Sequence, residues 1–378
     1  MRVKSSVGFA LVWLCVTGIA CDRDAIAEPP VSLVERPAPA PPEGEHRASL
    51  RTPRPEVDRE GLLIGEFPLA ADPVVDGDTI RVEGIDGSIR LLSIDTEEKI
   101  RSKADRAAVE HDFAQYLTKK RRNAIRPQKA GTPMGDHATE FAEAFFRGAE
   151  IVRLERDDPK EIRGHYGRLL AYVFAKKDGR WTSYNVECVR AGMSPYFTKY
   201  GYSHRFHNQL AHAEAEAREA KRGIWNPSAE SYGDYDERKA WWDARADFIR
   251  AFEQEANRRD DYIQLSHSDA NGRLEARLGQ EVTVLGTIGR IQTFKGLVRV
   301  SLAGEAHARF PLIFRDREVF RKSGIARYRG EPITARGTVE RYEKGSYRTL
   351  QIEVTNTGQL SFPSLPWPHD ETKTTAVR

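Results

Sequence analysis

The sequence predicts an α+β fold with two successive β-rich blocks, and three observations support this prediction. The chain has 378 residues, a length typical of two or three domains. Alternating apolar residues indicate strands between residues 72 and 177, and again between residues 279 and 360. Segments with helical spacing lie within and after the first block, and strands with helices around one core are typical of α+β proteins. The formal net charge of +3 excludes no class of partner.

Residues 1–21 have the features of an export signal. Arg2 and Lys4 precede an apolar stretch that is too short to span a bilayer comfortably. The stretch ends in TGIAC, so cleavage before Cys21 would resemble a bacterial lipoprotein signal, in which that cysteine is lipidated. Gly18 departs from the lipoprotein pattern, and ordinary cleaved secretion or an uncleaved anchor stay open. We therefore expect an exported protein of the cell envelope, periplasmic or anchored to the membrane by lipid, or secreted.

Residues 22–60 are rich in proline and poor in large apolar residues, which predicts a disordered tether. Only Cys188 lies outside the signal and its end, so neither an intramolecular disulfide nor a thiolate zinc cluster is expected. Cys188 stands between valines and is expected to be a small buried apolar residue.

The first β-rich block begins with a hairpin, in which DPVVDGDTIRVEG is followed by the turn IDGS and by IRLLSID. Residues 149–156 and 168–177 predict two further strands. Residues 135–148 predict a helix with Asp136 as its N-cap, and residues 203–225 predict another with Gly223 as its C′ residue. Residues 99–131 form a separate block with the basic run LTKKRRNAIRPQKAG. This run indicates either a solvated loop or a surface that attracts nucleic acid.

A charged helical stretch within residues 228–265 predicts a connecting helix. Residues 266–362 then contain five alternating segments with a helical insert after the third, which matches a small OB-type barrel. Residues 363–378 are expected to be a loose tail. Basic and aromatic residues of the second block are candidates for binding single strands, although a barrel that only packs against protein is an equal alternative. These candidates are Arg290, Phe294, Lys295, Arg299, Arg341, Tyr342 and Tyr347.

Asp76 and Asp78 open the first hairpin, where aspartate and glycine can simply form a turn at a strand entry. An antiparallel pairing could also bring Asp78 beside Asp95. Two carboxylates so close repel each other unless a cation lies between them, and an oxygen-only donor set suits Ca²⁺. Arg90 lies an odd number of positions before Asp95, so strand alternation places it on the opposite face unless the strand bulges or twists.

The motifs VVDGDTIRV, IRLLSIDTEE, HYGRLLAYVF and AEAEAREAKRGIW occur in an order that resembles the staphylococcal nuclease, or thermonuclease-like, family. The resemblance covers about residues 70–227 and implies a domain at 62–227 with a five-stranded OB-type barrel and packed helices. It further implies Ca²⁺-dependent hydrolysis of phosphodiester bonds in DNA and RNA.

The resemblance also assigns roles to individual residues. It implies that arginines grip the scissile phosphate, that a glutamate orients or deprotonates the attacking water, and that carboxylates and one carbonyl hold the metal. The implied catalytic residues are Arg90, Glu98 and Arg168, the metal ligands are Asp78, Asp95 and the Thr96 carbonyl, with Asp76 acting through water, and Tyr166 lines the nucleotide pocket. Counting back from GIW adds Tyr200 as a substrate-binding candidate.

Glu97 departs from the family, which usually has proline at this position. We expect glutamate to leave the loop that presents Glu98 freer, and to place a second carboxylate beside it.

Two alternatives to a nuclease stay open. One is a module of the same fold that binds nucleic acid with little or no cleavage, and the other is a structural envelope lipoprotein.

Overall fold

A computed structural model describes residues 61–161, 168–304 and 309–367. The predicted signal, Cys21, the tether and most of the tail lie outside these residues. Within the described ranges, none of the helices is both long enough and apolar enough to cross a membrane.

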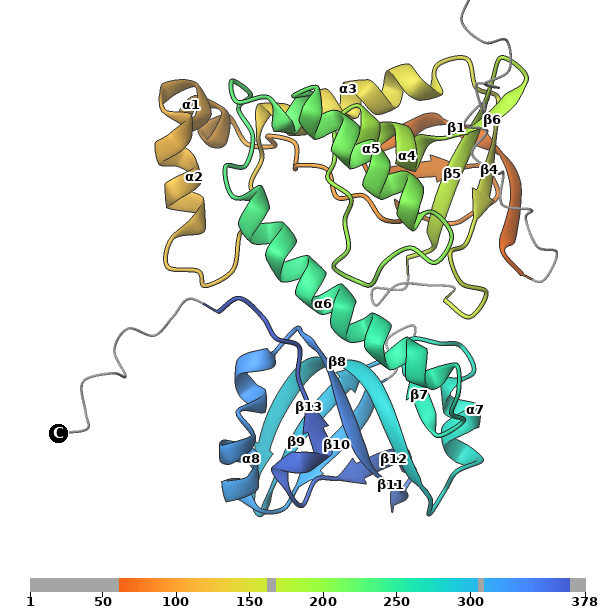
Figure 1. Cartoon of the computed structure of the whole chain (residues 1–378), viewed down its shortest axis with the longest axis vertical. Helices are drawn as coiled ribbons and strands as arrows, with labels where there is room; N and C mark the ends of the chain where they lie inside the picture. Colours follow the sequence, from red (N-terminus) through yellow and green to blue (C-terminus); the bar gives the residue numbers. More distant parts are fainter. Residues whose placement is uncertain (1–60, 162–167, 305–308, 368–378) are drawn as a thin grey trace, which may run out of the picture. The chain divides into compact units, whose positions relative to one another are not determined.

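The first β-rich block folds into a closed five-stranded barrel (Figure 1). Its strands are β1 (Leu63–Asp76), β2 (Thr79–Val82), β3 (Ile89–Leu91), β4 (Ile151–Glu155) and β5 (Leu170–Lys177). The barrel closes because β3 pairs with both β2 and β5, which yields the cyclic order β1-β2-β3-β5-β4. The β3–β5 pair is parallel and the other pairs are antiparallel. A further strand, β6 (Arg180–Ser183), extends the sheet beyond β5.

Three helices of this block contribute to its apolar core. They are α3 (Pro133–Phe146), α4 (Tyr184–Arg190) and α5 (His207–Glu219). Ala142 of α3 and Leu210 of α5 are fully buried with Ile80 and Ile89 of the barrel strands. Cys188 of α4 lies in the same core, as expected, and burial raises the pKa of its thiol to about 12.

Two predicted helix ends are wrong. The N-cap of α3 is Thr132, whose hydroxyl accepts a hydrogen bond from Gly135 N at 3.2 Å, and Asp136 falls in the first turn instead. Proline at the first helical position favours this earlier start because it needs no hydrogen-bond partner for an N–H there. Helix α5 ends before Gly223, because Lys221 takes the left-handed conformation, with φ 50°, directly after the C-cap Ala220. Gly223 instead begins a short 3-10 helix, Gly223–Trp225.

The block at residues 99–131 contains two helices that sequence reasoning missed, α1 (Lys103–His111) and α2 (Phe113–Arg121). The helical conformation is interrupted between them at Asp112, which is extended with φ −161°. Its side chain caps α2 by accepting a hydrogen bond from Gln115 N at 2.9 Å. The basic run therefore begins as the last turn of α2, where positive charge interacts favourably with the helix dipole. The rest of the run, residues 122–131, follows the helix.

The predicted connecting helix is α6 (Tyr235–Ala256). Near its C-terminal end, Ile249 and Phe252 pack with Leu285 of β8.

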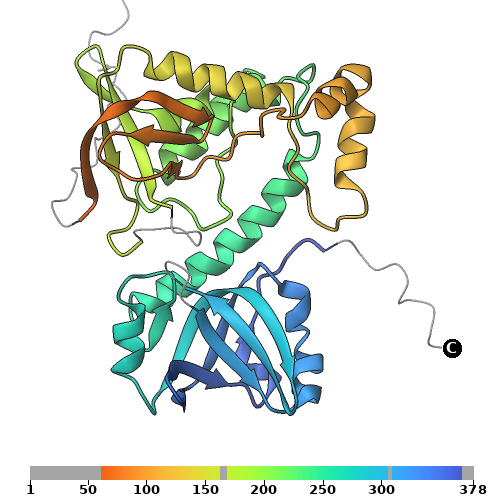
Figure 2. The ribbon, with the colours of Figure 1, turned by 180° about the vertical axis from the view of Figure 1, so that it is seen from behind.

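The second β-rich block is a closed barrel with the same strand order as the first (Figure 2). Its strands are β8 (Glu281–Phe294), β9 (Leu297–Ala303), β10 (Arg309–Phe314), β11 (Pro332–Lys344) and β12 (Tyr347–Glu353). Pairing of β11 with both β8 and β12, and the parallel β10–β12 pair, yield the order β8-β9-β10-β12-β11. Helix α8 (Arg317–Ser323) follows the third strand, as the sequence predicts. Smaller elements are β7 (Tyr262–Gln264), α7 (Ala270–Glu275), β13 (Leu360–Ser361) and the 3-10 turns Ile325–Tyr328 and Thr357–Gln359.

Candidate functional site

The DGDT motif is a turn between two strands rather than the start of one. Strand β1 ends at Asp76, which pairs with Thr79 of β2, so Gly77 and Asp78 form the tight connection. A Cβ on Gly77 would lie 2.8 Å from Ala138 Cβ of α3, so the turn packs too closely for another residue. The interpretation of Asp and Gly as turn formers is therefore correct, but it does not account for the side chain of Asp78.

The carboxylate of Asp78 is buried and tied to a distant segment. Its Oδ1 accepts from the Thr79 hydroxyl at 2.9 Å, and its Oδ2 accepts from Thr96 N at 3.1 Å. The turn is thereby fastened to the segment that follows β3, as the hairpin prediction required. Asp76 lies at the edge of this arrangement, where its Oδ1 accepts from Asp78 N at 3.3 Å.

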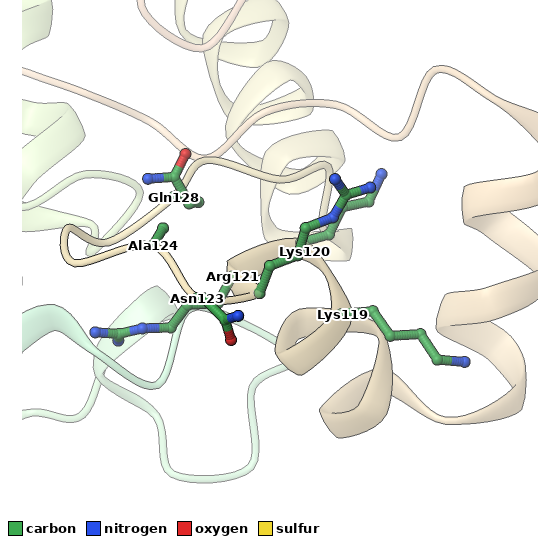
Figure 3. A pocket seen from close by; sticks show the side chains of 7 residues that line it. Lys119, Lys120, Arg121, Asn123, Ala124 and Gln128 are labelled. Atoms are coloured by element: carbon green, nitrogen blue, oxygen red, sulfur yellow. The ribbon is translucent and has the colours of Figure 1, made fainter.

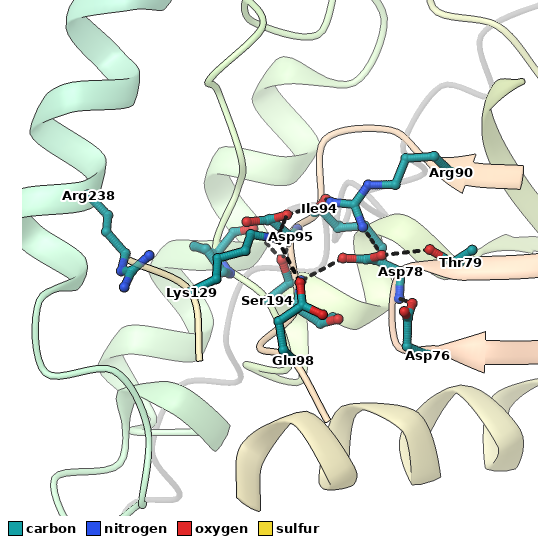
Figure 4. A network of polar contacts seen from close by, with 12 residues as sticks. Asp76, Asp78, Thr79, Arg90, Ile94, Asp95, Glu98, Lys129, Ser194 and Arg238 are labelled. Atoms are coloured by element: carbon teal, nitrogen blue, oxygen red, sulfur yellow. Dashed lines mark hydrogen bonds and ion pairs between the residues drawn. The ribbon is translucent and has the colours of Figure 1, made fainter. Parts of the chain in front are cut away.

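Arg90 lies on the same side as Asp95, contrary to the strand-alternation prediction. Its guanidinium forms ion pairs with both Asp78 and Asp95, and the Nη2–Oδ1 distance to Asp95 is 2.5 Å (Figure 4). Alternation fails because β3 ends at Leu91 and Ser93 takes a positive φ of 60°, which turns the chain back. One guanidinium therefore bridges two carboxylates that the sequence separates.

Lys129 is a second cation in this cluster, and sequence reasoning missed it. Its Nζ lies 2.8 Å from Asp95 Oδ1 and 3.2 Å from Glu98 Oε1 (Figure 4). Burial opposes ionisation of Asp95, but Lys129 and Arg90 outweigh it and hold the pKa of that carboxyl below its usual value. The only sequence indication of Lys129 was its place in a basic run, because no local spacing relates it to residue 95.

Glu97 anchors its loop, and the expectation of a freer loop is wrong. Its side chain is buried, and its Oε1 accepts from Tyr232 N and from the Tyr235 hydroxyl, both at 2.7 Å. The hydroxyl of Thr132 donates to the other oxygen. Burial raises the pKa of Glu97, partly offset by these three hydrogen bonds. Hydrogen bonds thus hold the backbone next to Glu98, where the family uses proline.

Gly135 of α3 packs directly against the same loop, which leads to a first prediction. A Cβ at this position would lie 2.9 Å from Glu97 O and closer still to Glu98 O. We expect Gly135→Ala to cost about 1–3 kcal/mol of stability through overpacking. We also expect it to displace Glu98 and lower kcat at least about tenfold, because small misplacements of reacting groups are costly. Thermal melting and initial cleavage rates measure the two effects.

Gly272→Ala is the matched control for this prediction. Gly272 is also helical, in α7, but a Cβ there would meet nothing within 4 Å. This replacement should leave stability unchanged or raise it by up to about 1 kcal/mol, since alanine is the better helix former. Equal behaviour of the two variants would contradict the proposed close contact.

The remaining candidates differ in how the structure places them. Arg168 is exposed and lies two residues before Leu170 of β5, the register partner of Arg90. Tyr166 lies outside the described residues. Tyr200 is 69% exposed, at the end of a segment that contacts the cluster through a 2.8 Å hydrogen bond from Asp95 N to the Ser194 hydroxyl.

The basic run lines a shallow hollow of about 490 Å³ at the end of α2 (Figure 3). Two of its cations are paired, Arg121 with Glu237 at 2.6 Å and Lys120 with Asp105 at 2.8 Å. The lining residues are Lys119, Lys120, Arg121, Arg122, Asn123, Ala124 and Gln128. The lining is mainly basic, and attraction of nucleic acid to this surface stays a prediction.

The donor chemistry of the cluster fits a hard cation. Carboxylate oxygens of Asp78, Asp95 and Glu98 and the Thr96 carbonyl are the ligand types that Ca²⁺ prefers. As they stand, Arg90 and Lys129 contact these carboxylates, and no group of three or more His, Cys, Asp or Glu side chains in the described ranges is arranged to hold a metal ion. Metal binding therefore requires some of these ion pairs to rearrange.

Comparison with known proteins agrees with the first barrel. Residues 88–227 match the family model described as staphylococcal nuclease homologue. This part of the chain is a staphylococcal nuclease-type domain on an OB-like barrel.

Three curated proteins are similar to about two fifths of the chain. An uncharacterized protein of Methanocaldococcus jannaschii is 29% identical over 157 residues, which cover 40% of this chain and 69% of that protein. The thermonuclease of Staphylococcus hyicus is 25% identical over 155 residues, covering 40% of this chain and 72% of the thermonuclease. An uncharacterized protein of Bacillus anthracis is 30% identical over 155 residues, covering 40% of this chain and 58% of that protein.

Proposed function

We propose that this protein is an exported, Ca²⁺-dependent nuclease that hydrolyses phosphodiester bonds of DNA, RNA or both. The observation that supports it most is the meeting of Asp78, Arg90 and Asp95, with Glu98 beside them, in a domain of the staphylococcal nuclease type. A module that only binds nucleic acid needs no such set of carboxylates. The similarity to a thermonuclease is in accord with this proposal.

Each residue has a role that its chemistry supports. Arg90 and Arg168 bind the phosphate, since guanidinium groups offer paired donors to phosphate oxygens and stay charged at any working pH. They stabilise the charge that builds up on those oxygens in the transition state more than the charge of the substrate. Glu98 orients or deprotonates the attacking water. Ca²⁺ held by Asp78, Asp95 and the Thr96 carbonyl would supply further positive charge at the phosphate.

A cleavage assay tests this function. Purified protein is incubated with single-stranded and double-stranded DNA and with RNA, in Ca²⁺ or in EDTA. We expect cleavage in Ca²⁺ that EDTA abolishes. Absence of cleavage in Ca²⁺, Mg²⁺ and Mn²⁺, with salt-sensitive binding intact, would support the binding module instead.

Arg168→Ala should lower kcat by about 10²–10³-fold, the usual effect of removing one preorganised donor to a developing negative charge. Arg168 is exposed two residues before β5, so its replacement should leave the melting temperature within the error of the wild type. Unchanged kcat in this variant would refute its role at the phosphate. Single-turnover rates separate this step from product release.

Tyr200→Ala should weaken binding of single-stranded substrates by a factor of about ten, because an exposed ring can stack on a base. Lys199 lies over this ring at 5.5 Å, which adds positive charge beside the stacking surface. Tyr200→Phe, which keeps the aromatic ring, provides the control and should bind these substrates like the wild type. Equilibrium binding in EDTA measures both variants, and an unaltered affinity of Tyr200→Ala would contradict the stacking role.

The location of the protein is part of the proposal. The N-terminal sequence supports export, with lipidation of Cys21 as the proposed anchor. Metabolic labelling with palmitate, compared between the wild type and Cys21→Ser, tests this anchor. Labelling that persists in the variant would exclude it.

A further inference from the structure

Lys129 occupies the space between Asp95 and Glu98, two carboxylates that the proposed function assigns to metal binding and to base catalysis. Its ammonium lies within 3.2 Å of an oxygen of each. Salt bridges with lysine are often adventitious at a surface, and the Lys129 side chain is 44% exposed. The position of its backbone therefore decides whether the contact is built into the fold.

The backbone on both sides of Lys129 is held by side chains from beyond the first barrel. Gln128 O accepts from Arg238 Nη2 at 2.5 Å, and the Tyr232 hydroxyl contacts both Ala130 N, at 2.9 Å, and Ala130 O, at 2.6 Å. Both anchoring residues are buried, and the Arg238 guanidinium lies 4.1 Å from the Tyr232 ring centroid. These contacts fix the backbone position from which the Lys129 side chain extends.

The two residues after Ala130, Gly131 and Thr132, pair the segment that carries Lys129 with the loop that carries Glu98. Gly131 forms a parallel bridge with Glu98, and Thr132 N donates to Glu98 O at 2.9 Å. The segment that delivers the ammonium and the segment that delivers the carboxylate are therefore parts of one hydrogen-bonded unit. Its anchors Tyr232 and Arg238 lie after residue 227, where the match to the nuclease family ends.

We propose that Lys129 is an internal cation that competes with a divalent metal for Asp95 and Glu98. Binding of the metal then requires the ammonium to leave both carboxylates, so Lys129 lowers the affinity of the site for Ca²⁺. The inference builds on the metal site of the proposed function. It adds a residue that weakens metal binding, and an extension, residues 232–238, that holds this residue in place.

The charges around the site agree with this competition. Asp78, Asp95 and Glu98 together carry three negative charges, and Arg90 and Lys129 contribute two positive charges at contact distance. Removing the ammonium leaves the negative charge of Glu98 without this partner and makes the site more attractive to a cation. It also leaves Asp95 and Glu98 to repel each other when no metal is present.

Calcium binding measured without nucleic acid tests the proposal independently of cleavage. Isothermal titration with Ca²⁺, and Tb³⁺ luminescence, are applied to the wild type, Lys129→Met and Lys129→Arg. We expect Lys129→Met to bind Ca²⁺ at least about tenfold more tightly, because one positive charge in contact with the ligands is lost. Lys129→Arg retains the charge and should stay close to the wild type.

Lys103→Met is the matched control, because Lys103 is exposed at the start of α1 and this substitution also removes one positive charge. Its Ca²⁺ affinity should equal that of the wild type. Thermal melting gives a second measurement that does not depend on a resolved binding isotherm. We expect Lys129→Met to melt lower than the wild type in EDTA and to gain more from added Ca²⁺, because a ligand stabilises in proportion to its affinity.

The outcomes separate this inference from the proposed function. Unchanged or weaker Ca²⁺ affinity in Lys129→Met, or no Ca²⁺ binding in any of these proteins, would overturn the competition. Tighter binding in Lys129→Met by a protein that never cleaves nucleic acid would support the competition and refute the nuclease. Cleavage by the wild type with unchanged Ca²⁺ affinity in Lys129→Met would support the nuclease and refute the competition.

Discussion

Glu98→Gln is expected to lower kcat by about 10²–10⁴-fold, the usual contribution of a positioned general base. Glutamine has the shape of glutamate but cannot accept the proton of the attacking water at working pH. We expect no comparable loss of stability, because Glu98 is 39% exposed and its described ion pair, with Lys129, is of a type worth at most about 1 kcal/mol. Single-turnover cleavage and thermal melting of the same preparation measure both quantities.

The rate and the stability of Glu98→Gln together separate a catalytic from a structural role. An unchanged kcat would show that another group acts as the base. A large drop in melting temperature would instead indicate a structural role for Glu98.

Glu97→Val should have the opposite pattern, with a loss of about 3 kcal/mol or more in the free energy of unfolding. Valine removes the acceptor of three hydrogen bonds and leaves buried donors unpaired, from Tyr232 N, Tyr235 and Thr132. The effect extends to α3, because Thr132 caps that helix. Urea unfolding, followed by circular dichroism, measures the loss.

Glu97→Gln is the control for this second prediction. The oxygen of its side-chain amide can still accept from Tyr232 N and the Tyr235 hydroxyl, and the amide NH₂ group can donate to the Thr132 hydroxyl. We expect it to lose less than half of what the valine variant loses. Similar losses in both variants would mean that the charge of Glu97, rather than its hydrogen bonds, stabilises the loop.

Sequence patterns identified the strands of the second barrel and part of the first, whose five-stranded architecture was implied by the family resemblance and whose strand β1 was not predicted. Alternation at residues 149–156 and 168–177 identified β4 and β5, and five alternating segments with an insert after the third identified the second barrel. These patterns succeed because the inward and outward sides of a strand are set by its own residues. The helix within residues 228–265 followed from a pattern of the same local kind.

Local reasoning failed where one residue with a positive φ changes the direction of the chain. Strand alternation placed Arg90 away from Asp95, but the positive φ of Ser93 reverses the chain between them. Gly223 resembled a helix-ending glycine, yet Lys221 ends α5 earlier. Serine and lysine rarely adopt a positive φ, so the sequence pattern did not predict it at these positions.

The sequence alone determined the candidate residues, since aspartates, arginines and a glutamate in motifs that resemble a known family are the groups proposed to bind a phosphate and a hard cation. Tertiary structure alone decided which residues accompany them. Lys129 meets Asp95 across 34 positions of sequence, and Glu97 meets Tyr235 across 138. Such contacts depend on where separate segments lie after folding, because hydrogen bonds and ion pairs act over a few ångströms while sequence patterns report only on neighbours along the chain.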